Sequence, residues 1–314
     1  MTLTTGAADH RRILACAQDW RGELLAIATV VETWRSAPCP VGTHMLIHQD
    51  GRFTGSVSGG CVEADVLQMA ADILAGAPVC VRRYGVTNDS AWEVGLPCGG
   101  NIVVLVQPVS EHGFAPELLD RVSASIAKGE QVLIGTDLAT GKSQFIDEVT
   151  PDTFINIYAP PRRLLIVGAV EIGIALANLA KSVGMEVIVI DPRARFLTRD
   201  RFPGLTLDDR WPDEAVAALK PDCRTAIVTL SHDLKIDDPA LMAAIGSPAA
   251  YIGALGSRAS HAARVGRLRA AGASEAQVSR IDGPAGVTIS AITSSEIALS
   301  IMAGIIRKFN DGLR

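Results

Sequence analysis

The chain has 314 residues, of which 48% are hydrophobic and 20% are charged, and its formal net charge is −5. This length predicts two domains, each with enough apolar material for a packed core. The acidic balance and the lack of a basic tract argue against nucleic-acid binding, and no apolar stretch approaches the length of a membrane span.

The cysteine content and the start of the chain indicate a reducing compartment. Six cysteines are scattered along the sequence, and the first residues are polar, unlike those of a signal peptide. We therefore expect free thiols in the cytoplasm rather than a disulfide framework.

Residues 1–113 are predicted to form an α+β domain. Its expected helices are 11–22 and 62–74, and its expected strands are 24–32, 44–48, 79–84 and 102–106. Asp50 and Gly51 form a strong hairpin signal after the second of these strands. Residues 114–160 are predicted to be a connecting α/β segment, with a helix at 116–128 and strands at 131–137 and 143–149. Pro160 and Pro161 indicate a linker, because neither can continue a helix or a central strand.

Residues 161–314 show a different pattern, in which short apolar runs alternate with helical segments. The expected strands are 164–167, 186–190, 226–229 and 250–253. A helix is expected from the glycine turn at 168–173 to about 183, and further helices are expected at 239–245, 256–271 and 294–309. This alternation predicts the α/β class: a Rossmann-like domain with a doubly wound parallel sheet. The apolar stripe of the last helix indicates core packing and leaves a homodimer open.

The most informative motif is the run Ser58-Gly59-Gly60-Cys61, which precedes the expected helix at 62–74. Consecutive glycines allow backbone amides to point into one concavity, and the start of a helix adds further unpaired amides. A cysteine placed there is expected to have a depressed pKa and to act as a nucleophile or a soft ligand. Glu63 is expected near the third position of the helix, where it is a catalytic candidate or a capping residue. The alternative is a tight glycine turn that carries a small apolar cysteine.

A second glycine-flanked thiol occurs at Cys98-Gly99-Gly100. Two such thiols in one domain suggest a pocket for a soft metal, a sulfur ligand or an anion, with Cys61 and Cys98 as ligands. Their wide spacing argues against a structural zinc site.

The Rossmann-like half contains a modified dinucleotide fingerprint. Gly168 and Gly173 occupy the positions for the turn and for close helix packing, whereas Val170 stands where the pyrophosphate needs bare backbone. Asp191 ends the second strand, where an acidic residue commonly binds a ribose, although it also suits a strand-end turn before Pro192.

Two further strand ends are expected at the same edge of this sheet. His232 follows the strand at 226–229 and could be a metal ligand, a base or a capping residue. The run Gly256-Ser257-Arg258 opens a helix with a glycine turn, a hydroxyl and a guanidinium, and it is predicted to bind phosphate or simply to cap the helix.

Six motifs in fixed order resemble those of the XdhC/CoxI family: GSVSGGCVEADV, LPCGGN, the glycine turn at 168, TLSHD, YIGALGSR and SSEIALSIMAG. These proteins are accessory proteins of xanthine dehydrogenase and related molybdenum hydroxylases. The resemblance implies binding of the molybdenum cofactor, a molybdopterin that carries a phosphate. It also implies delivery to the apoenzyme, with a sulfurase as a further partner. Cys61 and Cys98 would then be the soft groups, and residues 256–258 would take the phosphate. The chain departs from the family at Val170 and Glu171, where Gly and His are common.

The same residues are also compatible with two other functions. The Rossmann-like half and Asp191 fit an NAD(P)-dependent oxidoreductase, and Cys61, Glu63, Cys98 and His232 fit a metal-dependent enzyme. A cofactor-insertion chaperone without turnover of its own remains the favoured interpretation.

Overall fold

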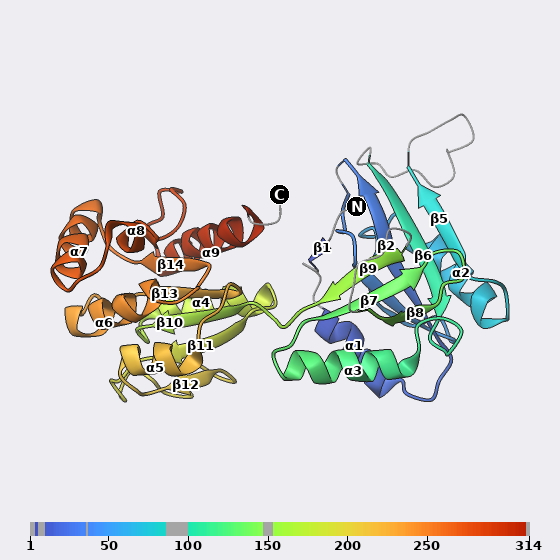
Figure 1. Cartoon of the computed structure of the whole chain (residues 1–314), viewed down its shortest axis with the longest axis horizontal. Helices are drawn as coiled ribbons and strands as arrows, with labels where there is room; N and C mark the ends of the chain where they lie inside the picture. Colours follow the sequence, from blue (N-terminus) through green and yellow to red (C-terminus); the bar gives the residue numbers. More distant parts are fainter. Residues whose placement is uncertain (1–3, 6–9, 36, 86–99, 147–152, 312–314) are drawn as a thin grey trace. The chain divides into compact units, whose positions relative to one another are not determined.

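The computed structural model describes residues 4–5, 10–35, 37–85, 100–146 and 153–311 (Figure 1). The chain divides into two compact units, Met1–Pro160 and Pro161–Arg314. The segment at 114–160, predicted to connect the domains, contributes one helix and three strands to the first unit among its described residues. None of the described helices combines the length and the apolarity needed to cross a bilayer.

The described residues of the first unit form two sheets. The larger sheet is antiparallel, in the order β4-β3-β2-β6-β5, and the smaller has the order β1-β9-β7-β8. Its elements are β1 (Thr4–Thr5), α1 (His10–Asp19), β2 (Leu25–Trp34), β3 (His44–His48), β4 (Phe53–Gly55), α2 (Glu63–Leu74), β5 (Cys80–Tyr84), β6 (Asn101–Pro108), α3 (Pro116–Ala127), β7 (Val132–Asp137), β8 (Ser143–Phe145) and β9 (Thr153–Tyr158). The hairpin predicted at Asp50-Gly51 is confirmed by the pairing of β3 with β4.

The central strand β2 is buried on both faces over its first six residues. Ala26 and Ala28 face a core that includes the apolar stripe of α2, whereas Leu25 and Ile27 face a second core with α1 and α3. The larger sheet is therefore covered by helices on both faces. Because α2 packs on the sheet, the turn that leads into it is held at a fixed place beside β4.

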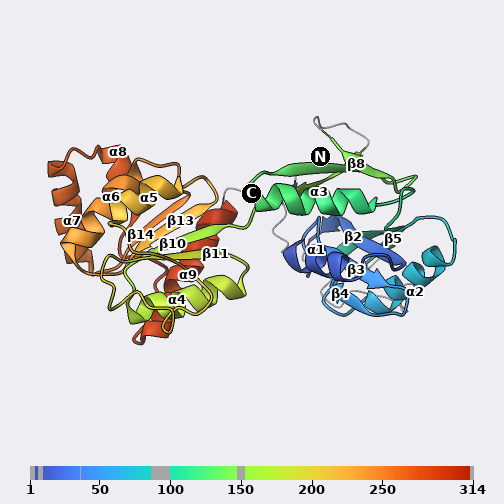
Figure 2. The same ribbon diagram turned by 90° about the horizontal axis from the view of Figure 1, so that it is seen from below.

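The second unit is a six-stranded parallel sheet in the order β12-β11-β10-β13-β14-β15. Its elements are β10 (Arg163–Val167), α4 (Glu171–Ser182), β11 (Glu186–Ile190), β12 (Thr206–Asp208), α5 (Pro212–Leu219), β13 (Thr225–Thr229), α6 (Leu234–Ile245), β14 (Tyr251–Ala254), α7 (Arg258–Ala270), α8 (Glu275–Val278), β15 (Ile281–Asp282) and α9 (Ser294–Asp311). The strand order reverses between β10 and β13, so the predicted doubly wound fold is confirmed. Figure 2 shows α4 and α9 on one face and α5, α6 and α7 on the other, and each face has its own apolar core.

The start of one helix differs from the sequence prediction. A helix was expected from 239, but α6 begins at Leu234 and contains Pro239 in its interior. Asp233 caps the helix by accepting from the Lys235 amide, and this cap stabilises the extra turn ahead of the proline. The short elements β12, α5, α8 and β15 were not expected either.

Helix α7 offers a stabilising substitution at Gly266. This glycine is exposed in mid-helix, and an added Cβ would meet nothing within 4 Å. We expect Gly266→Ala to raise the free energy of unfolding by about 0.5–1 kcal/mol, because alanine has less backbone entropy to lose. Urea denaturation measures this. In the control Gly272→Ala, the new side chain also meets nothing within 4 Å, but the residue has φ of +98°; stability should fall by about 1 kcal/mol. Equal signs for the two variants would contradict the prediction.

Candidate functional site

The turn at residues 56–62, between β4 and α2, is called here the Cys61 turn. Glu63, the first residue of α2, folds back into it and is 8% exposed. Its Oε1 accepts from the amides of Val57 at 3.2 Å and Ser58 at 2.9 Å. Its Oε2 accepts from the amides of Gly60 at 2.9 Å and Val62 at 3.2 Å. One carboxylate therefore gathers four backbone amides.

Two serine hydroxyls use the remaining amides of the Cys61 turn. Ser56 Oγ accepts from the Gly59 amide at 2.8 Å, and Ser58 Oγ accepts from the Cys61 amide at 2.9 Å. Both hydroxyls in turn donate to the Glu63 carboxylate. The predicted cradle of amides exists, but its occupant is Glu63. The expectation that these amides act on the Cys61 sulfur is therefore wrong, because every amide from 57 to 62 already has an acceptor within the turn.

The environment of Glu63 fixes its ionisation. Burial would raise the pKa of this carboxyl, but the hydrogen bonds from Ser56 and Ser58 outweigh it and lower the pKa to about 2. Glu63 is thus an ionised acceptor whose oxygens are already engaged. The contacts give it a structural role at the first helical position rather than the third, and its predicted catalytic role stays a prediction.

Cys61 itself is exposed at the tip of the turn, next to the exposed Gly59 and Gly60. The two glycines have φ of +77° and +120°, values that favour glycine, whereas Ser58 is buried. The structure therefore exposes the thiol on a turn whose amides from 57 to 62 are hydrogen-bonded. Its predicted roles as nucleophile and ligand stay predictions.

Cys39, in the loop between β2 and β3, also contacts the turn and was not predicted from the sequence. This half-buried thiol hydrogen-bonds with Ser56 and with the Gly59 backbone. Burial raises the pKa of Cys39, and the charge of Glu63 raises it further, so Cys39 is a neutral thiol that packs against the turn. The only signal in the sequence was its position between Pro38 and Pro40.

Cys98 and Gly99 lie outside the described residues, so their pairing with Cys61 is not tested. Within the described part of the chain, no group of three or more His, Cys, Asp or Glu side chains could hold a metal ion. Cys61 and Glu63 belong to the first unit and His232 to the second.

The second unit brings its predicted residues to the carboxyl edge of the sheet. Gly168 follows β10 with φ of +105°, and a Cβ there would lie 2.8 Å from the Ser231 amide nitrogen. A Cβ at Gly173 would lie 3.0 Å from the Gly168 carbonyl oxygen. The predicted roles of these glycines in the turn and in close packing are confirmed, whereas nucleotide binding stays a prediction.

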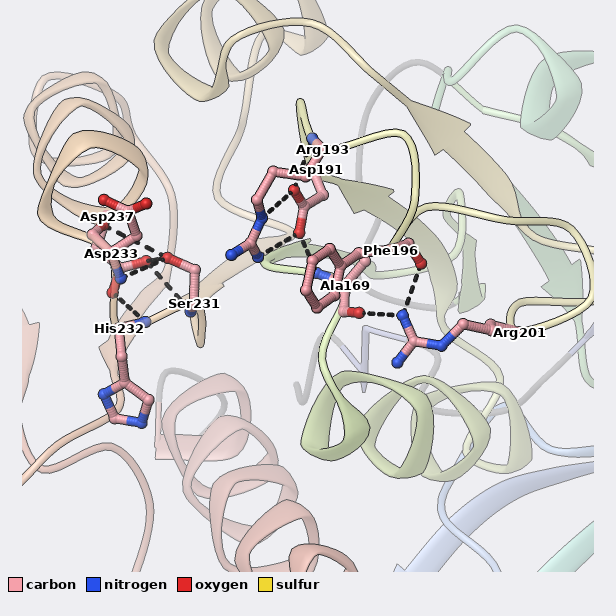
Figure 3. A network of polar contacts seen from close by, with 9 residues as sticks. All are labelled: Ala169, Asp191, Arg193, Phe196, Arg201, Ser231, His232, Asp233 and Asp237. Carbon is pink, nitrogen blue, oxygen red and sulfur yellow. Dashed lines mark hydrogen bonds and ion pairs between the residues drawn. The ribbon is translucent and has the colours of Figure 1, made fainter.

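Asp191 is fully buried, and its oxygens are taken by this chain. Oδ2 accepts from the Ala169 amide at 2.7 Å, and Arg193 forms a two-pronged ion pair with both oxygens (Figure 3). Burial would raise the pKa of Asp191, but Arg193 and the amides lower it overall. Arg201 closes the same turn by donating to the Ala169 and Phe196 carbonyls. Asp191 thus holds the turn together, and a ribose could reach it only by displacing Arg193.

The loop after β13 is organised by Asp237, an aspartate that was not predicted from the sequence. Asp237, buried on α6, accepts from the Ser231 hydroxyl at 2.7 Å and from the His232 amide at 3.2 Å. His232 is exposed with φ of +59°, and Figure 3 shows its ring pointing away from Asp233 and Asp237. Asp233, rather than His232, caps the helix. The spacing of Asp233 and Asp237 within one helical turn was the available signal.

The third predicted strand end is the turn before α7. Ser257 caps this helix by accepting from the Ser260 amide at 3.1 Å, so the capping alternative is confirmed. Gly256 has φ of +142°, and Arg258 is exposed. Behind them lies Arg264, which donates to the Leu255 carbonyl at 2.8 Å. Phosphate binding by residues 256–258 stays a prediction.

Comparison with known proteins places these features in a family. The sequence model of the XdhC Rossmann domain matches residues 164–305, and that of the XdhC and CoxI family matches residues 20–85. The molybdenum cofactor insertion chaperone PaoD of Escherichia coli is 30% identical over 308 residues, which cover 95% of this chain and 88% of that protein. A protein of Bacillus subtilis described as a probable xanthine dehydrogenase subunit is 27% identical, covering 91% of this chain and 93% of that protein.

A solved structure supports the fold. The crystal structure described as a xanthine dehydrogenase from Bacillus halodurans superposes with a TM-score of 0.82 at 24% identity, over 96% of this chain and 95% of that one.

Proposed function

The chain belongs to the XdhC and CoxI family, and on that premise we propose that it is an accessory protein that binds the molybdenum cofactor and delivers it to a xanthine dehydrogenase-type molybdenum hydroxylase. The names of two relatives, a molybdenum cofactor insertion chaperone and a probable xanthine dehydrogenase subunit, support this role. A sulfurase and a second copy of this chain are further proposed partners.

The observation that carries the proposal is the exposed Cys61 thiol on a turn whose amides from 57 to 62 are all hydrogen-bonded. Molybdenum held by a dithiolene is a soft centre, and a thiolate is a soft ligand for such a centre or for a sulfur atom bound to it. Gly59 and Gly60 leave bare backbone beside the sulfur. The donor chemistry therefore fits the cofactor: Cys61 would hold it, while Glu63 keeps the turn in shape.

The surroundings of Cys61 favour a carrier over a turnover enzyme. A catalytic thiol needs an acid or base within hydrogen-bond reach. The carboxylate of this turn, Glu63, is held ionised by the hydrogen bonds from Ser56 and Ser58. It is therefore unsuited to proton transfer near neutral pH.

Exchange of the thiol for a hydroxyl tests the proposal. We expect Cys61→Ser, purified anaerobically from a host that makes the cofactor, to retain about tenfold less molybdenum and pterin per chain, because a neutral hydroxyl is a poor ligand for a soft metal. Elemental analysis and pterin fluorescence measure both.

The matched control is Cys223→Ser, which removes another exposed free thiol, on the loop before β13. It should retain the cofactor at the parent level. If Cys61→Ser also matches the parent, Cys61 is not the ligand. If the parent itself contains neither molybdenum nor pterin, the proposed function fails.

A further inference from the structure

Three side chains near the start of α7 contain buried polar atoms without a hydrogen-bond partner in the described structure. They are Arg264 through Nε and Nη1, His261 through Nδ1, and Thr229 through Oγ1. Arg264 and His261 lie on the first two turns of α7, and Thr229 ends β13. Buried polar atoms without partners are rare, so each needs an explanation such as a bound group.

Of the three side chains, Arg264 has the greatest need of a partner, because it is a cation that is only 5% exposed. Its Nη2 donates to the Leu255 carbonyl at 2.8 Å, and a Cβ added at Gly256 would lie 3.7 Å from that nitrogen. The guanidinium therefore lies against the turn that begins α7. A buried charge is costly unless an opposite charge or several acceptors accompany it.

The nearby carboxylates do not meet this need. Asp237 interacts electrostatically with Arg264, but its oxygens accept from Ser231 and His232, and no ion pair joins it to Arg264 among the described residues. Asp238 instead forms a two-pronged ion pair with Arg267. An acceptor for Nε and Nη1 of Arg264 is therefore absent from the described chain.

The start of α7 offers positive potential at the same place. Helix α7 has 13 residues, and Ser257 caps only the Ser260 amide. The amides of Arg258 and Ala259, the first two residues of the helix, have no intrahelical acceptor, and they contribute to the positive end of the helix dipole. Arg258 is exposed at this end.

We propose that the turn at residues 255–258 is a binding site for a phosphate monoester, with Arg264 as its buried counter-charge. Such a group brings two negative charges and three acceptor oxygens. These suit a guanidinium on one side and helix amides on the other. The site itself stands on the unpartnered Arg264, whereas the choice of a pterin phosphate as its natural occupant rests on the proposed function.

Titration of the full chain with inorganic phosphate tests the site. We expect Arg264→Gln to weaken phosphate binding by about tenfold, because it removes the charge-assisted bonds. Arg269→Gln, which removes the same charge from the far end of α7, should bind within about twofold of the parent, because screening limits a charge at that distance. Isothermal titration calorimetry gives both constants. Equal affinity of Arg264→Gln and the parent would overturn the proposal.

A second readout covers the case in which Arg264→Gln folds poorly. In nitrogen-15 NMR of the parent, phosphate should shift the amides of residues 257–260, and Arg258→Gln, an exposed substitution, should weaken binding by a few-fold. Shifts confined to other parts of the chain would overturn the assignment.

Competition identifies the source of the monoester. A pterin phosphate as natural occupant predicts that cofactor-loaded protein no longer binds inorganic phosphate, whereas a nucleotide predicts displacement by adenosine monophosphate. If neither competes, the turn does not take a monoester and the proposal fails. Loss of molybdenum from the parent would instead refute the proposed function and leave phosphate binding unchanged.

Discussion

Replacement of Glu63 by alanine is expected to lower the free energy of unfolding of the first unit by about 3 kcal/mol, because four backbone amides and two hydroxyls lose their common acceptor. Unsatisfied buried groups cost about 1–3 kcal/mol each, but those at the edge of this exposed turn can recover water. Denaturant unfolding followed by circular dichroism measures the loss.

Glu296→Ala is the matched control for that substitution. Glu296 also accepts from two backbone amides at the start of a helix, Ile292 at 2.7 Å and Thr293 at 2.9 Å, but it does so at the surface. Its loss should cost about 1 kcal/mol, as for an ordinary helix cap. Equal losses in the two variants would show that Glu63 does not organise the Cys61 turn.

The pH dependence of Glu63→Gln provides an independent measurement. The pKa of Glu63 is lowered to about 2 in the folded chain, below its ordinary value of about 4.3. The stabilisation by its ionised form is therefore complete above about pH 5 and is lost as the pH falls toward 2. The stability difference between the parent and Glu63→Gln should shrink over that interval. A difference that is constant with pH would contradict the assignment.

Gly168→Ala is expected to be the most damaging change in the second unit, with a loss of about 4 kcal/mol. The new Cβ would lie 2.8 Å from the Ser231 amide nitrogen and 3.0 Å from its Cα, both rigid backbone atoms. Forced contacts of this kind cost about 1–3 kcal/mol, and a strained positive φ adds about 1–3 kcal/mol. Thermal and urea unfolding measure the sum.

Gly204→Ala separates the contact from the backbone strain. This glycine has φ of +68°, but an added Cβ would meet nothing within 4 Å. Its substitution should cost about 1 kcal/mol, which is the strain of the left-handed backbone alone. A similar loss in both variants would mean that β10 and β13 do not approach as closely at their carboxyl ends as the structure indicates.

Much of the second unit could be predicted from its sequence. The expected strands at 164–167 and 186–190 match β10 and β11 closely, because the central residues of a parallel strand are apolar on both faces. The prediction failed where the local signal was weak or misleading. Pro239 suggested a helix start, but the contacts of Asp237 and the Asp233 cap allow α6 to begin one turn earlier, at Leu234. Strand β12 has only three residues, too few for a periodic pattern.

The sites were predicted less completely than the fold. The glycines predicted the position of the Cys61 turn. They did not predict that Glu63 accepts its amides, because a glutamate at a helix start is also common as a partner of the helix dipole. Cys39 contacts the Cys61 turn only through tertiary folding, because strands β3 and β4 separate the two in the sequence. Arg264 resembles any other arginine of a basic helix in sequence, and only its burial distinguishes it.

The Asp191–Arg193 pair has a consequence for ligand choice. Any dinucleotide that used Asp191 in the usual way would first have to break a two-pronged ionic contact, which costs about 1.5–3 kcal/mol. That penalty would weaken apparent affinity by roughly 10- to 150-fold. Arg193 would therefore compete with the ribose of a dinucleotide for the Asp191 carboxylate. In a cell rich in NAD(P), this competition would disfavour occupation of the glycine turn by a dinucleotide.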